Sequence, residues 1–226
     1  MPRSPIVTID GPSGSGKGTI SRAVAVRVGW HLLDSGALYR LVALAGLKQG
    51  AKSDDVEAHA RIAGSMDVRF DVAVDGGELV VLSGEEVTRQ IRSEEAGQGA
   101  SRVAAWPPVR AALLDRQRAF AKAPGLVADG RDMGTVVFPN AALKIFLIAD
   151  PWERARRRLV QSLSRRPTDA EIAEETDALV RRDARDAMQT VQAKDAILID
   201  TTTLTQSEQV ARIVALAEAA IDRLGS

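Results

Sequence analysis

The chain has 226 residues, of which 45% are hydrophobic, and this is enough to bury the core of one elaborated domain or two small ones. Lys+Arg and Asp+Glu each number 30, so the formal net charge is zero, and the whole-molecule basic field of a nucleic-acid or anionic-membrane binder is absent. The lack of cysteine excludes disulfides, thiolate zinc sites and cysteine nucleophiles. No apolar run approaches the ~20 residues of a membrane span, and no signal-peptide pattern is present. We therefore expect a cytoplasmic protein that binds neither membranes nor nucleic acid. We also expect it to be a monomer, although none of these observations bears on its oligomeric state.

The first element in chain order is a short strand that leads through a glycine-rich turn into a helix. Ile6–Ile9 is apolar and mostly β-branched, and Asp10-Gly11-Pro12 stops it, which predicts a buried strand. A helical stretch follows from about Lys17 to Val28.

Four more apolar runs continue the strand pattern along the chain. They are about Trp30–Leu33, Leu126–Ala128, Leu143–Ile148 and Ala196–Ile199. Helical segments separate most of the strands, which is typical of a parallel sheet with crossover helices. The last helix begins at the capping-box sequence Thr205-Gln206-Ser207-Glu208, and its apolar residues recur at helical spacing. We predict an α/β fold with a five-stranded parallel sheet flanked by helices.

Two regions interrupt this alternation. Val68–Val72 and Leu79–Leu82 flank Asp75-Gly76-Gly77, which predicts a β-hairpin inserted into the α/β fold. From Pro151 to Ala187 the chain is charged, helical and rich in arginine. Both regions are expected to be appended or mobile elements around the α/β core.

The glycine-rich turn has the sequence of a phosphate-binding loop. It matches G-x-x-x-x-G-K up to Lys17 and lies between a strand and a helix, where such a loop binds phosphate through backbone N–H groups and the helix N-terminus. Lys17 would reach the β- and γ-phosphate oxygens. An ordinary strand–helix turn is the alternative, but it requires neither the lysine nor four glycines. The ATP-binding candidates are Gly11, Pro12, Ser13, Gly14, Ser15, Gly16, Lys17, Gly18 and Thr19.

Gly18 occupies the position where the common motif has a magnesium-binding Ser or Thr. The G-K-G-T sequence resembles the nucleoside monophosphate kinase branch of P-loop proteins. This resemblance implies that magnesium accompanies ATP and is held through water and phosphate oxygens, with no direct protein ligand.

Two further segments narrow the resemblance. Asp34–Arg40, read D-S-G-A-L-Y-R, and Asp129–Pro139, read D-G-R-D-M-G-T-V-V-F-P, together resemble the bacterial cytidylate (CMP) kinase family. This resemblance implies ATP-dependent phosphorylation of CMP or dCMP. It also implies one domain, with a core of about 1–40, 105–150 and 190–226, a monophosphate-binding insert of about 41–104 and a lid of about 151–189.

The resemblance also implies roles for individual side chains. Arginines suit this chemistry because a guanidinium meets two phosphate oxygens at once. By resemblance, Lys17, Arg131, Arg157 and Arg158 are catalytic, the last two as lid residues that reach the transferred phosphoryl group. Arg154 shares a helix face with Arg157 and Arg158 by its spacing. The implied CMP-binding residues are Ser35, Tyr39, Arg40, Ser101, Arg110, Asp129, Arg131, Asp132, Arg182 and Asp186.

Within this set, the resemblance assigns Asp132, Ser101 and Arg110 to the cytosine base and Asp186 to the sugar hydroxyls. The sequence departs from the family pattern at Gln189, where an arginine is usual. A neutral amide cannot replace a guanidinium on an anion, so either CMP is held less tightly or a neighbouring arginine substitutes.

Two alternatives remain at this point. The first is a P-loop kinase for another nucleoside monophosphate, such as UMP, dTMP or AMP. The second is a non-catalytic nucleotide-binding regulator. A regulator, however, has no use for the two acceptor motifs.

Overall fold

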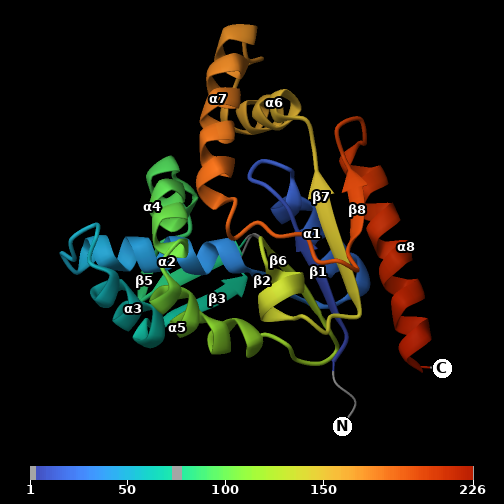
Figure 1. Cartoon of the computed structure of the whole chain (residues 1–226), viewed down its shortest axis with the longest axis horizontal. Helices are drawn as coiled ribbons and strands as arrows, with labels where there is room; N and C mark the ends of the chain where they lie inside the picture. The colour runs from blue at the N-terminus through green and yellow to red at the C-terminus, as the bar shows by residue number, and fades with distance from the viewer. Residues whose placement is uncertain (1–3, 73–77, 226) are drawn as a thin grey trace. The chain divides into compact units, whose positions relative to one another are not determined.

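The computed structural model describes residues 4–72 and 78–225 and divides into two compact units (Figure 1). We call residues 1–34 and 117–226 the sheet unit, and residues 35–116 the helical unit.

The sheet unit contains the predicted parallel sheet, with strand order β2-β6-β1-β7-β8. All four strand pairings are parallel, as the alternation of strands and helices predicted. The strands are β1 (Ile6–Asp10), β2 (His31–Asp34), β6 (Leu126–Gly130), β7 (Leu143–Ile148) and β8 (Ile197–Asp200). The central strand β1 therefore has β6 on one side and β7 on the other, and the edge strands β2 and β8 have four residues each.

The described residues of the sheet unit also form four helices and one π-helical turn. They are α1 (Lys17–Val28), the π-helical turn Met133–Val137, α6 (Pro151–Ser162), α7 (Asp169–Asp186) and α8 (Gln206–Gly225). The predicted capping box is present at the start of α8, since the Glu208 carboxylate accepts the Thr205 N–H at 2.8 Å and the Thr205 hydroxyl accepts the Glu208 N–H.

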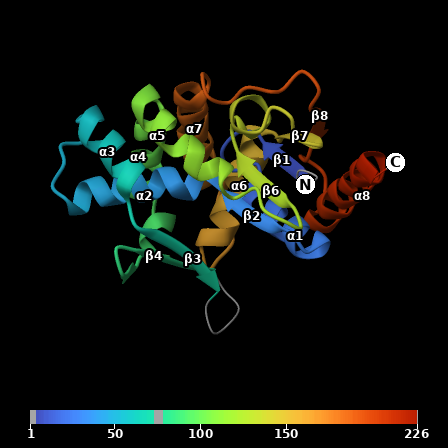
Figure 2. The same ribbon diagram turned by 90° about the horizontal axis from the view of Figure 1, so that it is seen from below.

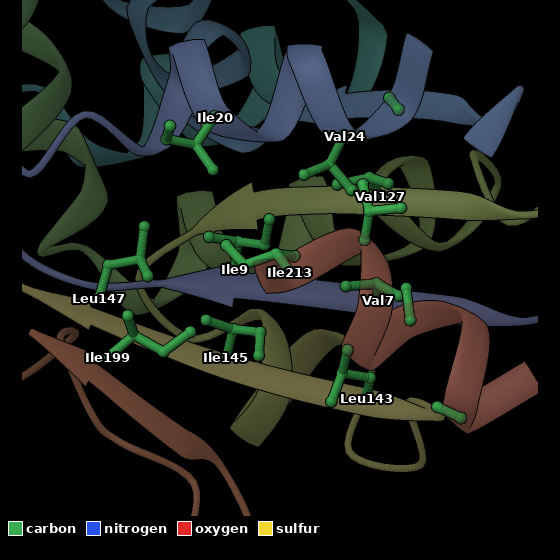
Figure 3. Close-up of a cluster of buried hydrophobic side chains, with 14 residues drawn as sticks. Val7, Ile9, Ile20, Val24, Val127, Leu143, Ile145, Leu147, Ile199 and Ile213 are labelled. Carbon is green, nitrogen blue, oxygen red and sulfur yellow. The ribbon is translucent and has the colours of Figure 1, made fainter. Parts of the chain in front are cut away.

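One face of the sheet forms the main hydrophobic core with α1 and α8 (Figure 3). Val7 and Ile9 of β1 point to this face, where they pack with Ile20 of α1, Ile145 of β7 and Ile213 of α8. Because side chains alternate along a strand, Thr8 and Asp10 point to the opposite face. Both are nevertheless buried, so β1 is covered on its two sides.

Within its described residues, the helical unit contains three whole helices, most of a fourth (α5) and a small antiparallel sheet (Figure 2). The predicted hairpin strands are confirmed as β3 (Val68–Val72) and β4 (Glu78–Leu82), and the predicted turn at residues 75–77 lies outside the described residues. The remaining elements are α2 (Ser35–Lys48), α3 (Val56–Ser65), β5 (Glu85–Glu86), the 3-10 turn Gln90–Arg92, α4 (Glu94–Ala104) and α5 (Pro107–Arg118).

Candidate active site

The phosphate-binding loop connects β1 to α1, as the motif predicted. Gly16 lies just before α1 with φ 84°, a left-handed conformation that favours glycine. A Cβ on Gly11 would lie 2.2 Å from the Leu147 carbonyl oxygen of β7, so no larger residue fits there. The loop is thus held against the central strands, and its backbone leads into a helix N-terminus suited to anions.

Lys17 is buried within this loop, and its Nζ donates to the Pro12 carbonyl oxygen at 2.7 Å. Burial lowers the pKa of Lys17, and the positive charges of Arg131 and Arg182 act in the same direction. A phosphate brought to the loop would oppose this effect because it would add negative charge beside the ammonium group.

Asp129, the next-to-last residue of β6, is a buried carboxylate close to the same loop. A Cβ added to Gly18 would lie 3.4 Å from Asp129 Oδ2, so the carboxylate faces the first turn of α1. Burial raises the pKa of Asp129, and the nearby charge of Lys17 opposes that rise.

Magnesium suits oxygen ligands, but no cluster of three or more acidic or histidine side chains is found in residues 4–72 and 78–225. A magnesium ion held mainly by phosphate and water is compatible with this arrangement, with Asp129 as the carboxylate beside the loop.

The π-helical turn that follows β6 carries two of the predicted acceptor residues at its start. Arg131 and Asp132 directly precede the turn, and the carbonyl oxygen of Asp132 accepts the N–H of Val136 at 2.9 Å. The first two N–H groups of the turn, from Met133 and Gly134, donate to Asp10 Oδ1 and Oδ2 at 2.9 and 2.8 Å.

Asp10 is not among the predicted site residues. Its only sequence signal is an acidic residue at the end of a buried strand, immediately before the phosphate-binding loop.

The structure brings together three of the predicted acceptor residues in the sheet unit. Asp186, at the end of α7, lies between two arginines, with its Oδ2 at 3.9 Å from Arg131 Nε and 3.7 Å from Arg182 Nε. The carboxylate balances two guanidinium groups that would otherwise repel each other.

The three predicted lid arginines on α6 have different environments. Arg154 is 3% exposed; its guanidinium donates to the Ser13 carbonyl oxygen of the phosphate-binding loop at 2.7 Å and pairs with Asp183 of α7 at 2.7 Å. Arg158 pairs with Glu175 of α7 at 2.7 Å. Of these three arginines, Arg154 donates to the phosphate-binding loop, and the spacing along α6 could not separate it from the other two.

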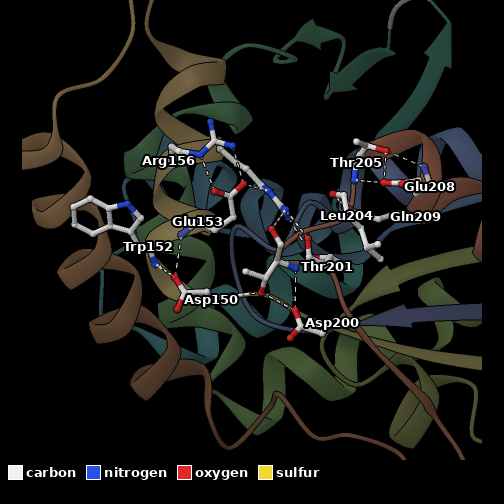
Figure 4. A network of polar contacts seen from close by, with 12 residues as sticks. Asp150, Trp152, Glu153, Arg156, Asp200, Thr201, Leu204, Thr205, Glu208 and Gln209 are labelled. Carbon is white, nitrogen blue, oxygen red and sulfur yellow. Dashed lines mark hydrogen bonds and ion pairs between the residues drawn. The ribbon is translucent and has the colours of Figure 1, made fainter.

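A polar network that includes Asp150, Glu153 and Thr201 lies around the ends of β7 and β8 (Figure 4). Arg157 takes part in this network. Its Nη2 donates to the carbonyl oxygens of Thr201 and Thr202, at 2.5 and 3.1 Å, and its Nε pairs with Glu153. Asp150 caps α6 by accepting the N–H groups of the first turn. The network fastens α6 to the segment that follows β8.

The helical unit carries the other predicted acceptor residues. Ser35, Tyr39 and Arg40 lie on α2, where the first two are buried and Arg40 donates to the Ile91 and Ser93 carbonyl oxygens at 2.8 and 3.2 Å. Ser101 lies on α4, which packs against α2, and Arg110 lies on α5. Each is partly exposed.

No described helix is long and apolar enough to cross a lipid bilayer.

The sequence of the chain is similar to those of cytidylate kinases. The family model described as cytidylate kinase matches residues 7–219. A cytidylate kinase of Stutzerimonas stutzeri (strain A1501) is 53% identical over 215 residues, which cover 93% of each chain. A cytidylate kinase of Pseudomonas aeruginosa (strain LESB58) is 52% identical over 216 residues, again 93% of each chain. Among solved structures, a gluconokinase from Sinorhizobium meliloti 1021 is similar with a TM-score of 0.48, at 13% identity over 98% of this chain and 95% of that one. The extent and identity of the sequence matches mean that this chain belongs to the cytidylate kinase family.

Proposed function

We propose that the chain transfers the γ-phosphoryl group of ATP to CMP or dCMP, giving ADP and CDP or dCDP. Family membership supports the reaction. The observation that carries the proposal is the concentration of phosphate-binding groups around one buried lysine. Arg131 and Arg182 both act electrostatically on Lys17 of the phosphate-binding loop, and Asp186 holds the two arginines together.

The chemistry requires positioning and charge balance more than proton transfer. The second pKa of a nucleotide phosphate is about 6, so the acceptor is largely dianionic at neutral pH and needs no general base. One of its oxygens attacks the γ-phosphorus in line, and the bond from that phosphorus to the β,γ-bridging oxygen breaks as ADP leaves. Cationic side chains lower the barrier by balancing the charge of two anions brought together.

In this proposal the phosphate-binding loop, residues 11–19, binds ATP, and Lys17 contacts the β- and γ-phosphates. Magnesium binds with ATP through phosphate oxygens and water, and supplies further charge neutralisation when present. Arg154 donates to the loop carbonyl of Ser13, so it is the lid arginine whose contacts best fit a role beside the phosphates. Arg157 and Arg158 remain lid candidates, although each is paired with a glutamate here.

Each proposed CMP-binding residue is assigned according to its chemistry. Arg131 and Arg182 suit the CMP phosphate, because a guanidinium can donate two parallel hydrogen bonds, and Asp186 suits the sugar hydroxyls. Asp132 suits the exocyclic amine of cytosine, since a carboxylate only accepts hydrogen bonds. The other proposed CMP-binding residues are Ser35, Tyr39, Arg40, Ser101, Arg110 and Asp129.

We further propose that about 41–104 acts as the monophosphate-binding insert and about 151–189 as the lid, in a chain that works as a monomer. The two-helix composition of the second segment and the direct contact of Arg154 with the phosphate-binding loop support its role as a lid.

A panel of acceptors tests the function. ATP consumption is measured in a coupled assay with CMP, dCMP, UMP, dTMP and AMP as acceptors and magnesium present. The fastest turnover is expected with CMP or dCMP. Equal or faster turnover of AMP or dTMP would replace this assignment with another monophosphate kinase, and binding without turnover of any acceptor would favour a regulator. Lys17→Met is the matched control, because it removes the ammonium group and should abolish turnover of every acceptor.

A further inference from the structure

The π-helical turn Met133–Val137 is capped from a distant part of the chain. The first N–H groups of a helical segment have no partner within it and are usually satisfied by a side chain at the residue just before it. Here that residue is Asp132, whose side chain makes no capping hydrogen bond. Asp10 caps the turn instead, from more than 120 positions away in sequence.

The cap uses both oxygens of one buried carboxylate. Oδ1 accepts the Met133 N–H at 2.9 Å and Oδ2 accepts the Gly134 N–H at 2.8 Å, and Asp10 is only 4% exposed. The turn also packs closely on the sheet, since a Cβ on Gly134 would lie 3.0 Å from Thr8 Oγ1 and 3.2 Å from a Lys144 side-chain carbon. The carboxylate and the packing together fix the position of this backbone relative to β1.

Asp10 occupies a special place in the chain. It ends the central strand β1, and the next residue, Gly11, begins the phosphate-binding loop. The loop has its own attachments, through the contact of Gly11 with Leu147 and through the bond from Lys17 to Pro12. Loss of the Asp10 cap would therefore release the turn more than it releases the loop.

The two residues just before the capped N–H groups are Arg131 and Asp132, to which the proposed function gives the CMP phosphate and the cytosine amine. We propose that Asp10 is a positioning residue for the acceptor: by capping the turn it sets the direction in which Arg131 and Asp132 are presented, and so contributes to the selection of CMP over UMP. This inference rests on the proposed function.

Asp10→Asn tests the proposal with little change in shape. The amide offers one acceptor oxygen, and its NH₂ group faces the second N–H, so one of the two hydrogen bonds is lost. An unsatisfied buried N–H lowers the equilibrium constant for forming the structure that contains it by about tenfold or more. We therefore expect the CMP-to-UMP ratio of kcat/KM to fall about tenfold. The KM for ATP should change by less than about threefold if the phosphate-binding loop keeps its own attachments.

Glu208→Gln is the matched control. Glu208 also accepts a backbone N–H, at 2.8 Å, and lies in the same unit on α8, but it is outside the proposed binding residues. This variant should keep the wild-type CMP-to-UMP ratio. A purely structural role for Asp10 would lower the melting temperature of Asp10→Asn and leave the ratio and the KM for CMP unchanged, and that result would overturn the proposal.

Amide hydrogen exchange separates this proposal from the proposed function. The Met133 and Gly134 amides should exchange faster in Asp10→Asn than in the wild-type chain and in Glu208→Gln. If the wild-type chain did not phosphorylate CMP, the proposed function would fail, and the exchange data would still show whether Asp10 holds the turn.

Asp10→Glu keeps both acceptor oxygens on a side chain one methylene longer, and should give a selectivity loss smaller than that of Asp10→Asn. If neither Asp10 variant folded while Glu208→Gln did, the proposal would be overturned, since the carboxylate would then be a requirement of the fold.

Discussion

Asp132 offers the most direct test of base recognition at the scale of a single residue. A carboxylate can accept a hydrogen bond from the cytosine amine, whereas uracil presents a carbonyl oxygen at the same position and would leave the carboxylate unpaired. Asp132→Asn supplies an NH₂ group that can donate to that oxygen. We expect this variant to favour UMP over CMP relative to the wild type, by about 1–3 kcal/mol in the ratio of kcat/KM.

Asp132→Ala is the control for this change. It removes the recognition group without adding a donor, so it should lose CMP activity without gaining UMP activity. Initial rates with both acceptors at saturating ATP provide the measurement. Unchanged selectivity in both variants would assign base recognition to other residues.

Asp10 should also give the free energy of unfolding a characteristic pH dependence. Burial raises the pKa of Asp10 from 3.8 to about 6, against the lowering effect of its two backbone hydrogen bonds. The folded state therefore binds more protons than the unfolded state between these values, so this group contributes stability below pH 3.8 that is lost as the pH rises to about 6. Urea denaturation at several pH values across this interval measures the free energy of unfolding. As the pH rises, this free energy should decline less for Asp10→Asn than for the wild type. An equal decline in the wild type and in Asp10→Asn would contradict a raised pKa for Asp10.

At the scale of elements, Arg154 connects three segments: α6, on which it lies, the phosphate-binding loop through Ser13, and α7 through Asp183. Arg154→Met keeps much of the packing volume but leaves the partly buried Asp183 carboxylate without its partner. We expect the free energy of unfolding to fall by about 2–3 kcal/mol, less than for a fully buried ion pair because Asp183 is partly exposed, and the KM for ATP to rise. Urea denaturation and steady-state kinetics measure the two effects.

Arg156 provides the comparison on the same helix. It pairs with Glu153 three residues earlier and is largely exposed, so Arg156→Met should change stability by less than about 1 kcal/mol. Similar effects of the two substitutions would show that the contact of Arg154 with the loop has no special importance.

The elements differ in how well the sequence predicted them. The helix predicted from about Lys17 to Val28 is α1, and the predicted strands are present, because their apolar spacing and flanking glycines are local signals. The order of the arginines on α6 did not indicate which one is buried, since three of them share a face. That choice depends on the packing of α7, which comes from a separate part of the chain. The capping of the π-helical turn had no local signal either, because its acceptor lies on β1.

For the whole molecule, binding of each substrate should appear as a gain in stability. A ligand that binds only the folded state stabilises it by about 2.7 kcal/mol at a concentration 100 times its Kd. For a chain of this size, that corresponds to a rise in Tm of about 5–10 °C. We expect CMP alone to raise the Tm, and UMP at the same concentration to raise it less. Thermal melting followed by circular dichroism measures both, and the absence of any CMP effect without ATP would favour a regulator.

Across the whole molecule, the sequence predicted some of the proposed acceptor residues better than others. The resemblance indicated Arg131 in one segment and Arg182 with Asp186 in another, and the structure places these three together within one unit. The residues of the helical unit, such as Ser101 and Arg110, were indicated by resemblance alone. Their side chains lie on helices whose packing is set by long-range contacts, and no local pattern distinguishes them from ordinary surface residues.

The short edge strands of the sheet have a consequence for association between molecules. β2 and β8 have only four residues each, while the longer strands β1, β6 and β7 are enclosed on both sides. An incoming strand from another chain would therefore find few free backbone groups to pair with, although Ile197 and Leu198 of β8 are partly exposed. The β-branched residues that build the sheet are thus concentrated where intermolecular β-aggregation cannot easily begin.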